Sequence, residues 1–121
     1  MKVFFDTYAF FELIKGNEAY KKFEEGYSII TTKLNLMELY YGLLIQSNEE
    51  VASYFYDYFL KSSIGFDDET IKEAMKFRAI NKKGDLSYID CLGYIQALKS
   101  NIRFVTGDKD FKELPNVEFL K

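Results

Sequence analysis

The sequence predicts a single α/β domain with a mainly parallel central sheet of four to five strands, flanked by helices on both faces. Its 121 residues are enough for one hydrophobic core. Hydrophobic residues make up 48% of the chain and charged residues 29%, which is typical of a folded domain rather than a disordered segment. Short apolar segments alternate with helical patterns, which indicates β-α-β units and therefore parallel strands. With no repeat and no linker-like stretch, residues 1–121 are expected to form one domain.

The N-terminal half begins with a strand and a helix. Residues 2–5 are apolar and are expected to form a buried strand, after which Asp6 or Thr7 caps a helix over 8–15. Four further elements are expected up to residue 60: a short helical turn over 18–25, a β-branched strand over 27–30, a helix over 33–46 capped by Thr31 or Thr32, and a ring-rich helix over 49–60.

The C-terminal half continues the alternation. Residues 62–65 suggest a short strand, and Asp67 or Asp68 begins a helix that extends to about residue 81. The remaining expected elements are a helix over 87–99, a strand over 102–105, a turn, and a closing strand over 117–120.

Two absences restrict the chemistry. The chain has no His, which excludes histidine bases and imidazole-bound zinc or iron, and Cys91 is its single cysteine, which excludes an internal disulfide and cysteine metal clusters. Carboxylates must therefore carry most acid–base or metal chemistry, and a cation held by oxygen alone would be Mg²⁺, Mn²⁺ or Ca²⁺. The net charge of −3 argues weakly against nonspecific nucleic-acid coating.

The sequence gives no sign of a membrane segment. No apolar run approaches the ~18–20 residues of a membrane span. The apolar N-terminal stretch is interrupted by Asp6 and lacks a small-residue cleavage site, unlike a signal peptide. A cytoplasmic protein is expected.

Two acidic residues stand alone in apolar helices. Glu38 is the only charged residue from Leu34 to Asn48, and Asp90 is the only one in residues 86–98. A solvated helix face normally carries several charges, so both carboxylates are expected to be partly buried. Asp is also unfavourable inside a helix, so its presence there requires a reason.

Three more acids follow strands. Asp6 comes directly after residues 2–5, and Asp108 and Asp110 follow the strand near residue 105. Ligands of parallel α/β sheets bind beyond the carboxyl ends of the strands, where these acids and the two helical acids are expected to converge. Such carboxylates would repel one another, and a divalent cation would relieve the repulsion.

Each acid also has an ordinary structural interpretation. Asp6 can cap a helix, Glu38 can be a partly exposed helix residue, and Asp90 can bond the cap of another element. Asp108 and Asp110 can be turn residues. Their joint occurrence at compatible places is what favours a functional site.

Four segments together resemble the PIN-domain family, most closely its VapC-type toxins. They are KVFFDTYAFFELI, NLMELYYG, LSYIDCLGYIQA and FVTGDKDFKELPNVEFL, and they occur in the family's order over nearly the whole chain. The resemblance implies a Mg²⁺- or Mn²⁺-dependent endoribonuclease that hydrolyses RNA phosphodiester bonds with metal-activated water. By position, the catalytic and metal-binding acids are Asp6, Glu38, Asp90 and Asp108, supported by Thr7, Thr106 and Asp110.

The resemblance also implies partners: a second copy of the chain and a cognate antitoxin protein. The ring-rich segment 51–60 is a candidate contact surface, although its rings could equally belong to the core. RNA would have to be bound by basic side chains that could equally be solubilising charges: Lys33, Arg78, Lys82, Lys83, Lys109 and Lys112.

Two other functions remain open from the sequence. A haloacid-dehalogenase-type phosphatase also begins with a strand ending in Asp, but it requires a second Asp where this chain has Tyr8. A non-catalytic PIN-type module that binds RNA or protein is the other, although such a module is expected to have lost one of the four acids.

Overall fold

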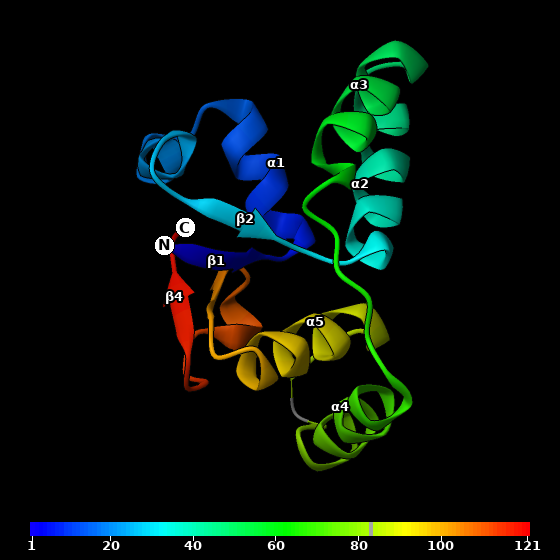
Figure 1. Ribbon diagram of the computed structural model, residues 1–121, viewed down its shortest axis with the longest axis vertical. Helices are drawn as coiled ribbons and strands as arrows, with labels where there is room; N and C mark the ends of the chain where they lie inside the picture. The colour runs from blue at the N-terminus through cyan, green and yellow to red at the C-terminus, as the bar shows by residue number, and fades with distance from the viewer. Residues whose placement is uncertain (83) are drawn as a thin grey trace.

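The computed structural model describes residues 1–82 and 84–121 and contains one four-stranded sheet in the order β2-β1-β3-β4 (Figure 1). All three strand pairs are parallel, as predicted. The four strands are β1 (Lys2–Phe5), β2 (Ser28–Ile30), β3 (Arg103–Thr106) and β4 (Val117–Phe119). Because the strands are parallel, their carboxyl ends share one edge of the sheet.

The helices lie where the sequence predicts them, to within a residue or two. Asp6, Thr32 and Asp67 are the N-caps of the first, second and fourth α-helices, and each side chain accepts a backbone N–H bond from the first turn. The helical elements are α1 (Thr7–Lys15), the 3₁₀ helix η1 (Glu18–Glu24), α2 (Lys33–Gln46), α3 (Glu49–Leu60), α4 (Asp68–Ile80), α5 (Tyr88–Lys99) and the 3₁₀ turn η2 (Lys109–Phe111).

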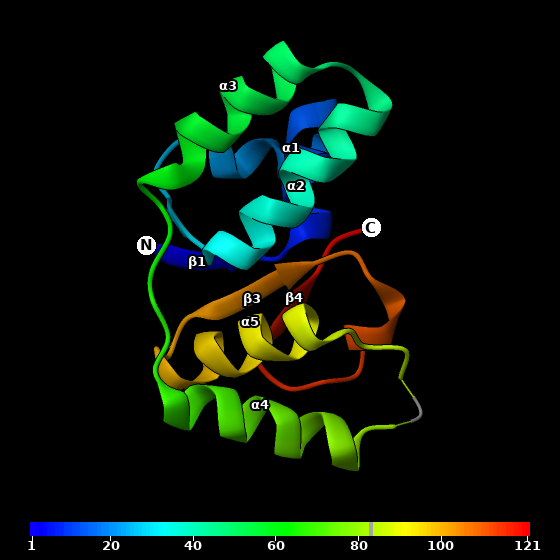
Figure 2. The same cartoon turned by 90° about the vertical axis from the view of Figure 1, so that its right-hand side faces the viewer.

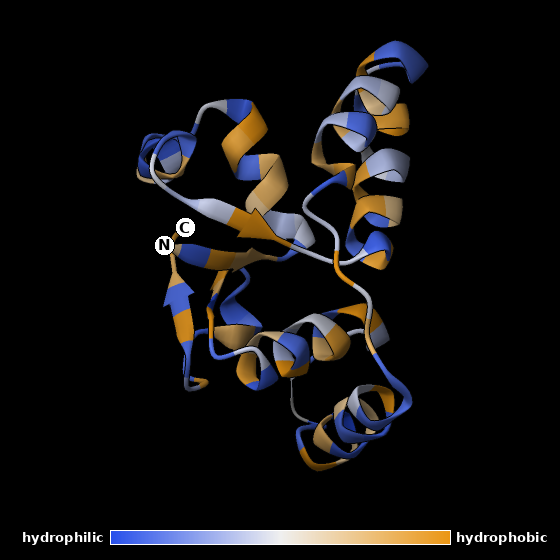
Figure 3. Cartoon of the chain, viewed as in Figure 1, coloured by the Kyte–Doolittle hydropathy of each residue, from blue (hydrophilic) through white to orange (hydrophobic). Residues whose placement is uncertain are grey.

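The sheet separates two hydrophobic cores. Successive side chains of a strand point to opposite faces, so Val3 and Phe5 of β1 join the core under α1, α2 and α3, while Phe4 joins the core under α5. Figure 2 shows α5 lying between β3 and α4, which forms the outer layer on that side. Apolar segments recur on the strands and on the covering helices (Figure 3). The expectation of helices on both faces is therefore confirmed.

The predicted short strand over residues 62–65 is wrong. Ser63 forms only an isolated bridge with Thr31, through the N–H of Thr31 donating to the carbonyl of Ser62 and the N–H of Ile64 donating to that of Thr31. The neighbouring strand β2 ends at Ile30, so residues 62–65 find too short a partner for a ladder. The sheet accordingly has four strands.

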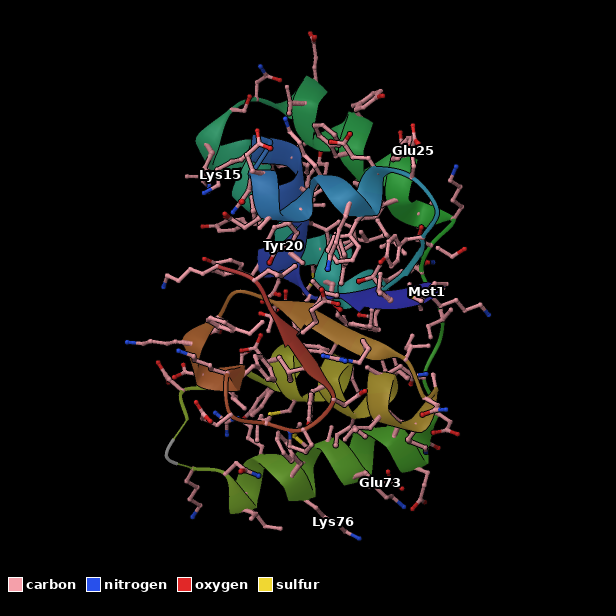
Figure 4. The ribbon with its side chains drawn as sticks, turned by 90° about the vertical axis from the view of Figure 1, so that its left-hand side faces the viewer. Met1, Lys15, Tyr20, Glu25, Glu73 and Lys76 are labelled. Carbon is pink, nitrogen blue, oxygen red and sulfur yellow. The ribbon has the colours of Figure 1, made fainter. Side chains whose placement is uncertain are left out.

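The end of the chain is fixed beside the first core. The hydroxyl of Tyr20, a fully buried residue of η1, donates to the carbonyl of Leu120 at 2.8 Å. Figure 4 shows Tyr20 between the helical segment above and the C-terminal segment below. Lys22 forms an ion pair with Glu118 of β4, one of the two edge strands of the sheet. Across the described parts of the chain, no helix combines the length and the apolar character needed to cross a bilayer.

Candidate functional site

A cavity of about 800 Å³ opens at the carboxyl ends of β1 and β3. The four predicted acids come from four separate segments of the chain, and all four line this cavity. The lining residues are Asp6, Thr7, Tyr8, Met37, Glu38, Tyr41, Ser87, Ile89, Asp90 and Asp108. The folded chain thus brings the predicted acids to one place.

Asp6 is both a helix cap and a cavity residue. It is only 3% exposed. Its Oδ1 accepts the N–H of Ala9 at 2.9 Å, and its Oδ2 accepts the hydroxyl of Thr106 at 2.6 Å. Asp6 is therefore both the cap of α1 and a residue of the candidate site. Thr106, predicted as a hydroxyl beside the site, holds the second oxygen of Asp6 in place.

The charge of Asp6 is costly in this position. Burial raises the pKa of Asp6 to about 8, against the opposing effect of its bonds from Thr106 and Ala9. The nearby carboxylates of Asp90 and Asp108 raise the pKa of Asp6 further. Asp6 is thus a carboxyl group that a neighbouring cation would favour in its ionised form.

Glu38 lies on α2, partly buried as its isolated position predicts. Its Oε1 accepts the hydroxyl of Thr7 at 2.6 Å, which places Thr7 beside the site as predicted. Burial raises the pKa of Glu38, the bond from Thr7 lowers this pKa, and the charge of Asp90 raises it again. The charge of Asp90 thus acts on Glu38, and both residues line the same cavity.

Asn35 is a residue whose contribution the sequence analysis missed. It is 1% exposed, and its Nδ2 donates to the hydroxyl oxygen of Thr7 at 3.2 Å. Its Oδ1 accepts the hydroxyl of Thr32 at 2.7 Å. The available signal was its spacing, since Asn35 and Glu38 lie three residues apart and so share a face of α2.

Asp90 lies in a helix as predicted, but the expectation that it occupies the middle of that helix is wrong. Helix α5 begins at Tyr88, and Asp90 occupies its first turn. Its Oδ2 accepts the N–H of Ser87 at 2.9 Å, while its own N–H donates to the hydroxyl of Ser87, which forms a capping box. The cap gives Asp90 a local reason to be acidic. Burial raises the pKa of Asp90, the bonds from Ser87 lower this pKa, and the charges of Asp108 and Asp110 raise it.

Asp108 and Asp110 differ in position. Asp108 lines the cavity, its N–H donates to the hydroxyl of Thr106 at 3.0 Å, and its Oδ1 accepts the N–H of Asp110 at 3.0 Å. Asp108 is therefore a turn residue and a cavity residue at once. Asp110 lines a neighbouring hollow with Lys82 rather than the cavity itself.

None of the predicted basic residues that the structure describes lines the cavity. Arg78 donates its Nε–H to the carbonyl of Leu86 and its guanidinium lies over the ring of Tyr88, so this side chain already has structural partners. Lys33 borders a different hollow, and the ammonium of Lys112 lies over the ring of Phe119. Lys82 and Lys109 are exposed, and the predicted Lys83 lies outside the described residues.

The donor set fits a hard cation in its chemistry. Four carboxylates with two adjacent hydroxyls offer only oxygen ligands, which suit Mg²⁺ or Mn²⁺. Cys91 is fully buried in the second core and lies outside this set. Within residues 1–82 and 84–121, no three acidic or cysteine side chains are already arranged closely enough to hold a metal ion. A cation held directly by three or more of these carboxylates would require them to approach one another, whereas Mg²⁺ commonly binds one or two carboxylates and several waters.

Apolar and aromatic side chains also line the cavity, which the sequence analysis did not predict. Tyr8, Met37, Tyr41 and Ile89 line it, and Tyr41 is 67% exposed. Met37 and Tyr41 are four residues apart, which places them on one face of α2. This spacing was visible in the sequence, but it was not interpreted as part of a binding cavity.

The ring-rich segment 51–60 is divided between core and surface. Ala52 and Phe59 are buried, and Phe55 and Tyr56 pack against the first core. Tyr54 and Tyr58 remain exposed, and their rings stack at a centroid distance of 6.2 Å. The prediction of a contact surface is thus restricted to those two rings.

Several solved structures share this fold. A chain of VapC20 from Mycobacterium tuberculosis, described as a sarcin-ricin loop cleaving toxin, superposes with a TM-score of 0.79 at 16% identity, covering 93% of this chain and 95% of that one. VapBC2 from Rickettsia felis, bound to a DNA fragment from its promoter, gives 0.76 at 24% identity with both chains fully covered. A toxin–antitoxin complex from Klebsiella pneumoniae gives 0.74 at 18% identity, covering 96% and 95%.

At these identities the likeness establishes the fold. No curated protein matches the sequence significantly. The sequence itself matches the PIN domain family over residues 3–117, which is nearly its whole length and includes all four cavity acids. The chain therefore belongs to the PIN domain family.

Proposed function

We propose that this chain is a Mg²⁺- or Mn²⁺-dependent endoribonuclease. The observation that carries the proposal is the convergence of Asp6, Glu38, Asp90 and Asp108 on one cavity at the carboxyl edge of a parallel sheet. Such a group of carboxylates is costly without a cation, because burial and mutual repulsion oppose ionisation. Membership of the PIN domain family, whose nucleases use divalent metals, supports the same assignment.

Each residue has a stated part in the proposed reaction. Asp6, Glu38, Asp90 and Asp108 would hold the cation, with Thr106 and Thr7 fixing the carboxylates of Asp6 and Glu38. A divalent cation bound there supplies an activated water and stabilises charge on the leaving oxygen of a phosphodiester. No side chain needs to act as a nucleophile, which agrees with a chain that lacks His.

Cleavage of RNA by the purified protein tests the proposal. We expect cleavage with Mg²⁺ or Mn²⁺, loss of cleavage in EDTA, and loss of at least 100-fold in Asp6→Asn and Asp90→Asn, with products bearing a 5′-phosphate and a 3′-hydroxyl. The matched control is Asp57→Asn, because Asp57 is exposed on α3 and does not line the cavity. Full activity in EDTA, or in both cavity variants, would refute the assignment.

We further propose that the chain is the toxin of a VapBC-type pair, with a cognate antitoxin, and that it forms a homodimer. The support is the shared fold, since one superposed structure is described as a toxin–antitoxin complex and two others as VapBC2 and VapBC-1. A neighbouring gene encoding a small protein that co-purifies with this chain and blocks its RNA cleavage is the expected result. Light scattering measures the oligomeric state of the chain alone.

A non-catalytic binding module remains the second candidate. The observation that favours it is that the described acids are not already arranged around a metal position. RNA binding without cleavage at any Mg²⁺ or Mn²⁺ concentration would support this alternative. The phosphatase is disfavoured by the family match and by Tyr8 at the place of its second Asp.

A further inference from the structure

The structure assigns Asn35 the role of a positioning residue for Glu38, exerted through the hydroxyl of Thr7. Asn35 does not line the cavity, so it acts only through its neighbours. The inference rests on the proposed function, because it concerns a carboxylate that is proposed to hold the cation. It adds to that function a residue outside the acidic set.

Three hydrogen bonds in sequence lead from the start of α2 to Glu38. The hydroxyl of Thr32 donates to Oδ1 of Asn35 at 2.7 Å. Nδ2 of Asn35 donates to Oγ1 of Thr7 at 3.2 Å, and the hydroxyl of Thr7 donates to Oε1 of Glu38 at 2.6 Å. All three bonds point the same way, toward the carboxylate.

The direction of these three hydrogen bonds follows from whether each group can donate or accept. An ionised carboxylate only accepts, so Thr7 must give its single hydrogen to Glu38. The oxygen of Thr7 is then an acceptor for its other neighbour, which requires Asn35 to present its NH₂ group. Asn35 consequently turns its carbonyl toward Thr32, whose hydroxyl donates. The amide of Asn35 therefore keeps the hydrogen of Thr7 directed at Glu38.

Because these side chains are buried, water cannot easily replace a hydrogen bond that is lost from the series. Thr32 is fully buried and Asn35 is 1% exposed, so a bond lost here leaves an unpaired polar group in the interior. Aligned hydrogen bonds also strengthen one another in such surroundings. Thr7 follows Asp6 directly in the chain, so fixing Glu38 on Thr7 also fixes Glu38 relative to Asp6.

The helix cap alone does not explain the side chain of Asn35. The capping bond is made by the backbone N–H of Asn35, which donates to the hydroxyl of Thr32 at 3.2 Å. Any residue except proline at position 35 would keep that bond. The amide group is therefore available for a separate task, and its donor is directed at Thr7.

Asn35→Leu tests the role, since it removes both polar atoms while keeping a side chain branched at Cγ and adds no charge. Residues that support metal ligands typically change metal affinity by 10–100-fold when replaced, and we expect a loss of that size in Mn²⁺ affinity by titration calorimetry. kcat for RNA cleavage is expected to fall while KM is unchanged, because Asn35 does not reach the cavity. If Asn35→Leu fails to fold, Asn35→Ala takes its place.

A double-variant cycle separates positioning from general destabilisation. Thr7→Val should lose Mn²⁺ affinity as Asn35→Leu does, Thr7→Ser should retain it, and Asn35→Leu should cause no further loss when added to Thr7→Val. The matched control is Asn48→Leu, because Asn48 caps α3 away from the cavity. Asn48→Leu should lower the stability of the protein and leave its Mn²⁺ affinity unchanged.

Crystal structures of the metal-free wild type and Asn35→Leu give a readout independent of activity. We expect the bond between Thr7 and Glu38 in the wild type and its loss, or a changed Glu38 rotamer, in the variant. An unaltered bond in the variant, or additive losses in the cycle, would overturn the role of Asn35. If the wild type neither binds Mn²⁺ nor cleaves RNA, the proposed function fails, and the comparison of crystal structures alone decides the positioning of Glu38.

Discussion

Asp6 both stabilises the fold as a helix cap and destabilises it as a buried charge. Its carboxylate caps α1, yet burial raises its pKa to about 8, against an ordinary value of 3.8. Between these two pH values the folded protein binds more protons than the unfolded chain. Stability from this group is therefore fully present below about pH 4 and is lost as the pH rises toward 8.

We expect Asp6→Asn to make the metal-free protein more stable at pH 8. Asn keeps an oxygen for the N–H of Ala9, so the cap remains, but it removes the charge that burial opposes. One unit of pKa corresponds to about 1.4 kcal/mol, so an increase of at least about 1 kcal/mol in the free energy of unfolding is expected. Urea unfolding at pH 5 and pH 8 measures it.

The variant should also show a weaker dependence of stability on pH between 4 and 8 than the wild type. Asp57→Asn serves as the control, because that carboxylate is exposed and its replacement should leave the wild-type pH dependence intact. A steeper dependence in Asp6→Asn than in the wild type would contradict the burial of an unfavourable charge.

At the scale of residues, the sequence identified the acids and the hydroxyls of Thr7 and Thr106 beside them, but not Asn35 behind Thr7. Glu38 and Asp90 were recognisable because charge is rare in apolar helices. Asn35 was not, because an uncharged amide in a helix has many ordinary explanations. Its role depends on a hydroxyl from α1, which lies 28 positions away in the chain. Contacts of this kind are created only by the fold.

At the scale of elements, the turn after β3 packs closely against α1 and the C-terminal segment. Gly107 lies between Thr106 and Asp108, and a Cβ there would lie 2.5 Å from the carbonyl oxygen of Leu120 and closer still to the ring of Tyr8. The oxygen belongs to the backbone and cannot turn aside. Glycine is therefore required for β3, α1 and the C-terminal segment to meet.

Gly107→Ala should destabilise the protein by about 1–3 kcal/mol, the usual cost of excess volume in a packed region. It should also reduce RNA cleavage, because relief of the clash moves Asp108 or Tyr8, both of which line the cavity. Gly65→Ala is the matched control, since a Cβ at Gly65 meets no atom within 4 Å. Equal melting temperatures for both variants would contradict the close approach.

The elements themselves were largely predictable. Caps at Asp6, Thr32 and Asp67, each followed by an apolar pattern, locate three helices closely. Residues 62–65 misled the prediction because a strand needs a partner, and the end of β2 at Ile30 is a property of the sheet rather than of those residues. Asp90 misled it because the first turn of α5 was taken for the interior of the helix.

At the scale of the whole molecule, the sheet order explains why the acids meet. Neighbours β1 and β3 are about a hundred residues apart in the chain, and their pairing places Asp6 beside Asp108 at one edge. Parallel pairing could be predicted from the alternation of elements. For this reason the sequence correctly predicted that the acids lie at the carboxyl edge of the sheet. The distances between the carboxylates could not be predicted, because they depend on side-chain packing and on the cation.

A cation bound to all four acids would join the two halves of the molecule. Asp6 and Glu38 belong to the half that covers the first core, while Asp90 belongs to the half that covers the second. A ligand that binds only the folded state stabilises it by about 2.7 kcal/mol at a hundred times its dissociation constant. We therefore expect Mn²⁺ to raise the melting temperature of the entire domain in one cooperative transition.

The increase should be larger at pH 8 than at pH 5, because burial and mutual repulsion raise the pKa values of Asp6, Glu38 and Asp90 and the cation must displace their protons. Glu38→Gln should reduce the increase, while Asp57→Asn, which removes an exposed carboxylate on α3, should not. Differential scanning calorimetry with and without Mn²⁺ at both pH values measures these differences. A rise in melting temperature that is the same in Glu38→Gln and in the wild type would mean that the ion binds elsewhere on the surface, because a cation held in the cavity must lose affinity when one of its four carboxylates becomes an amide.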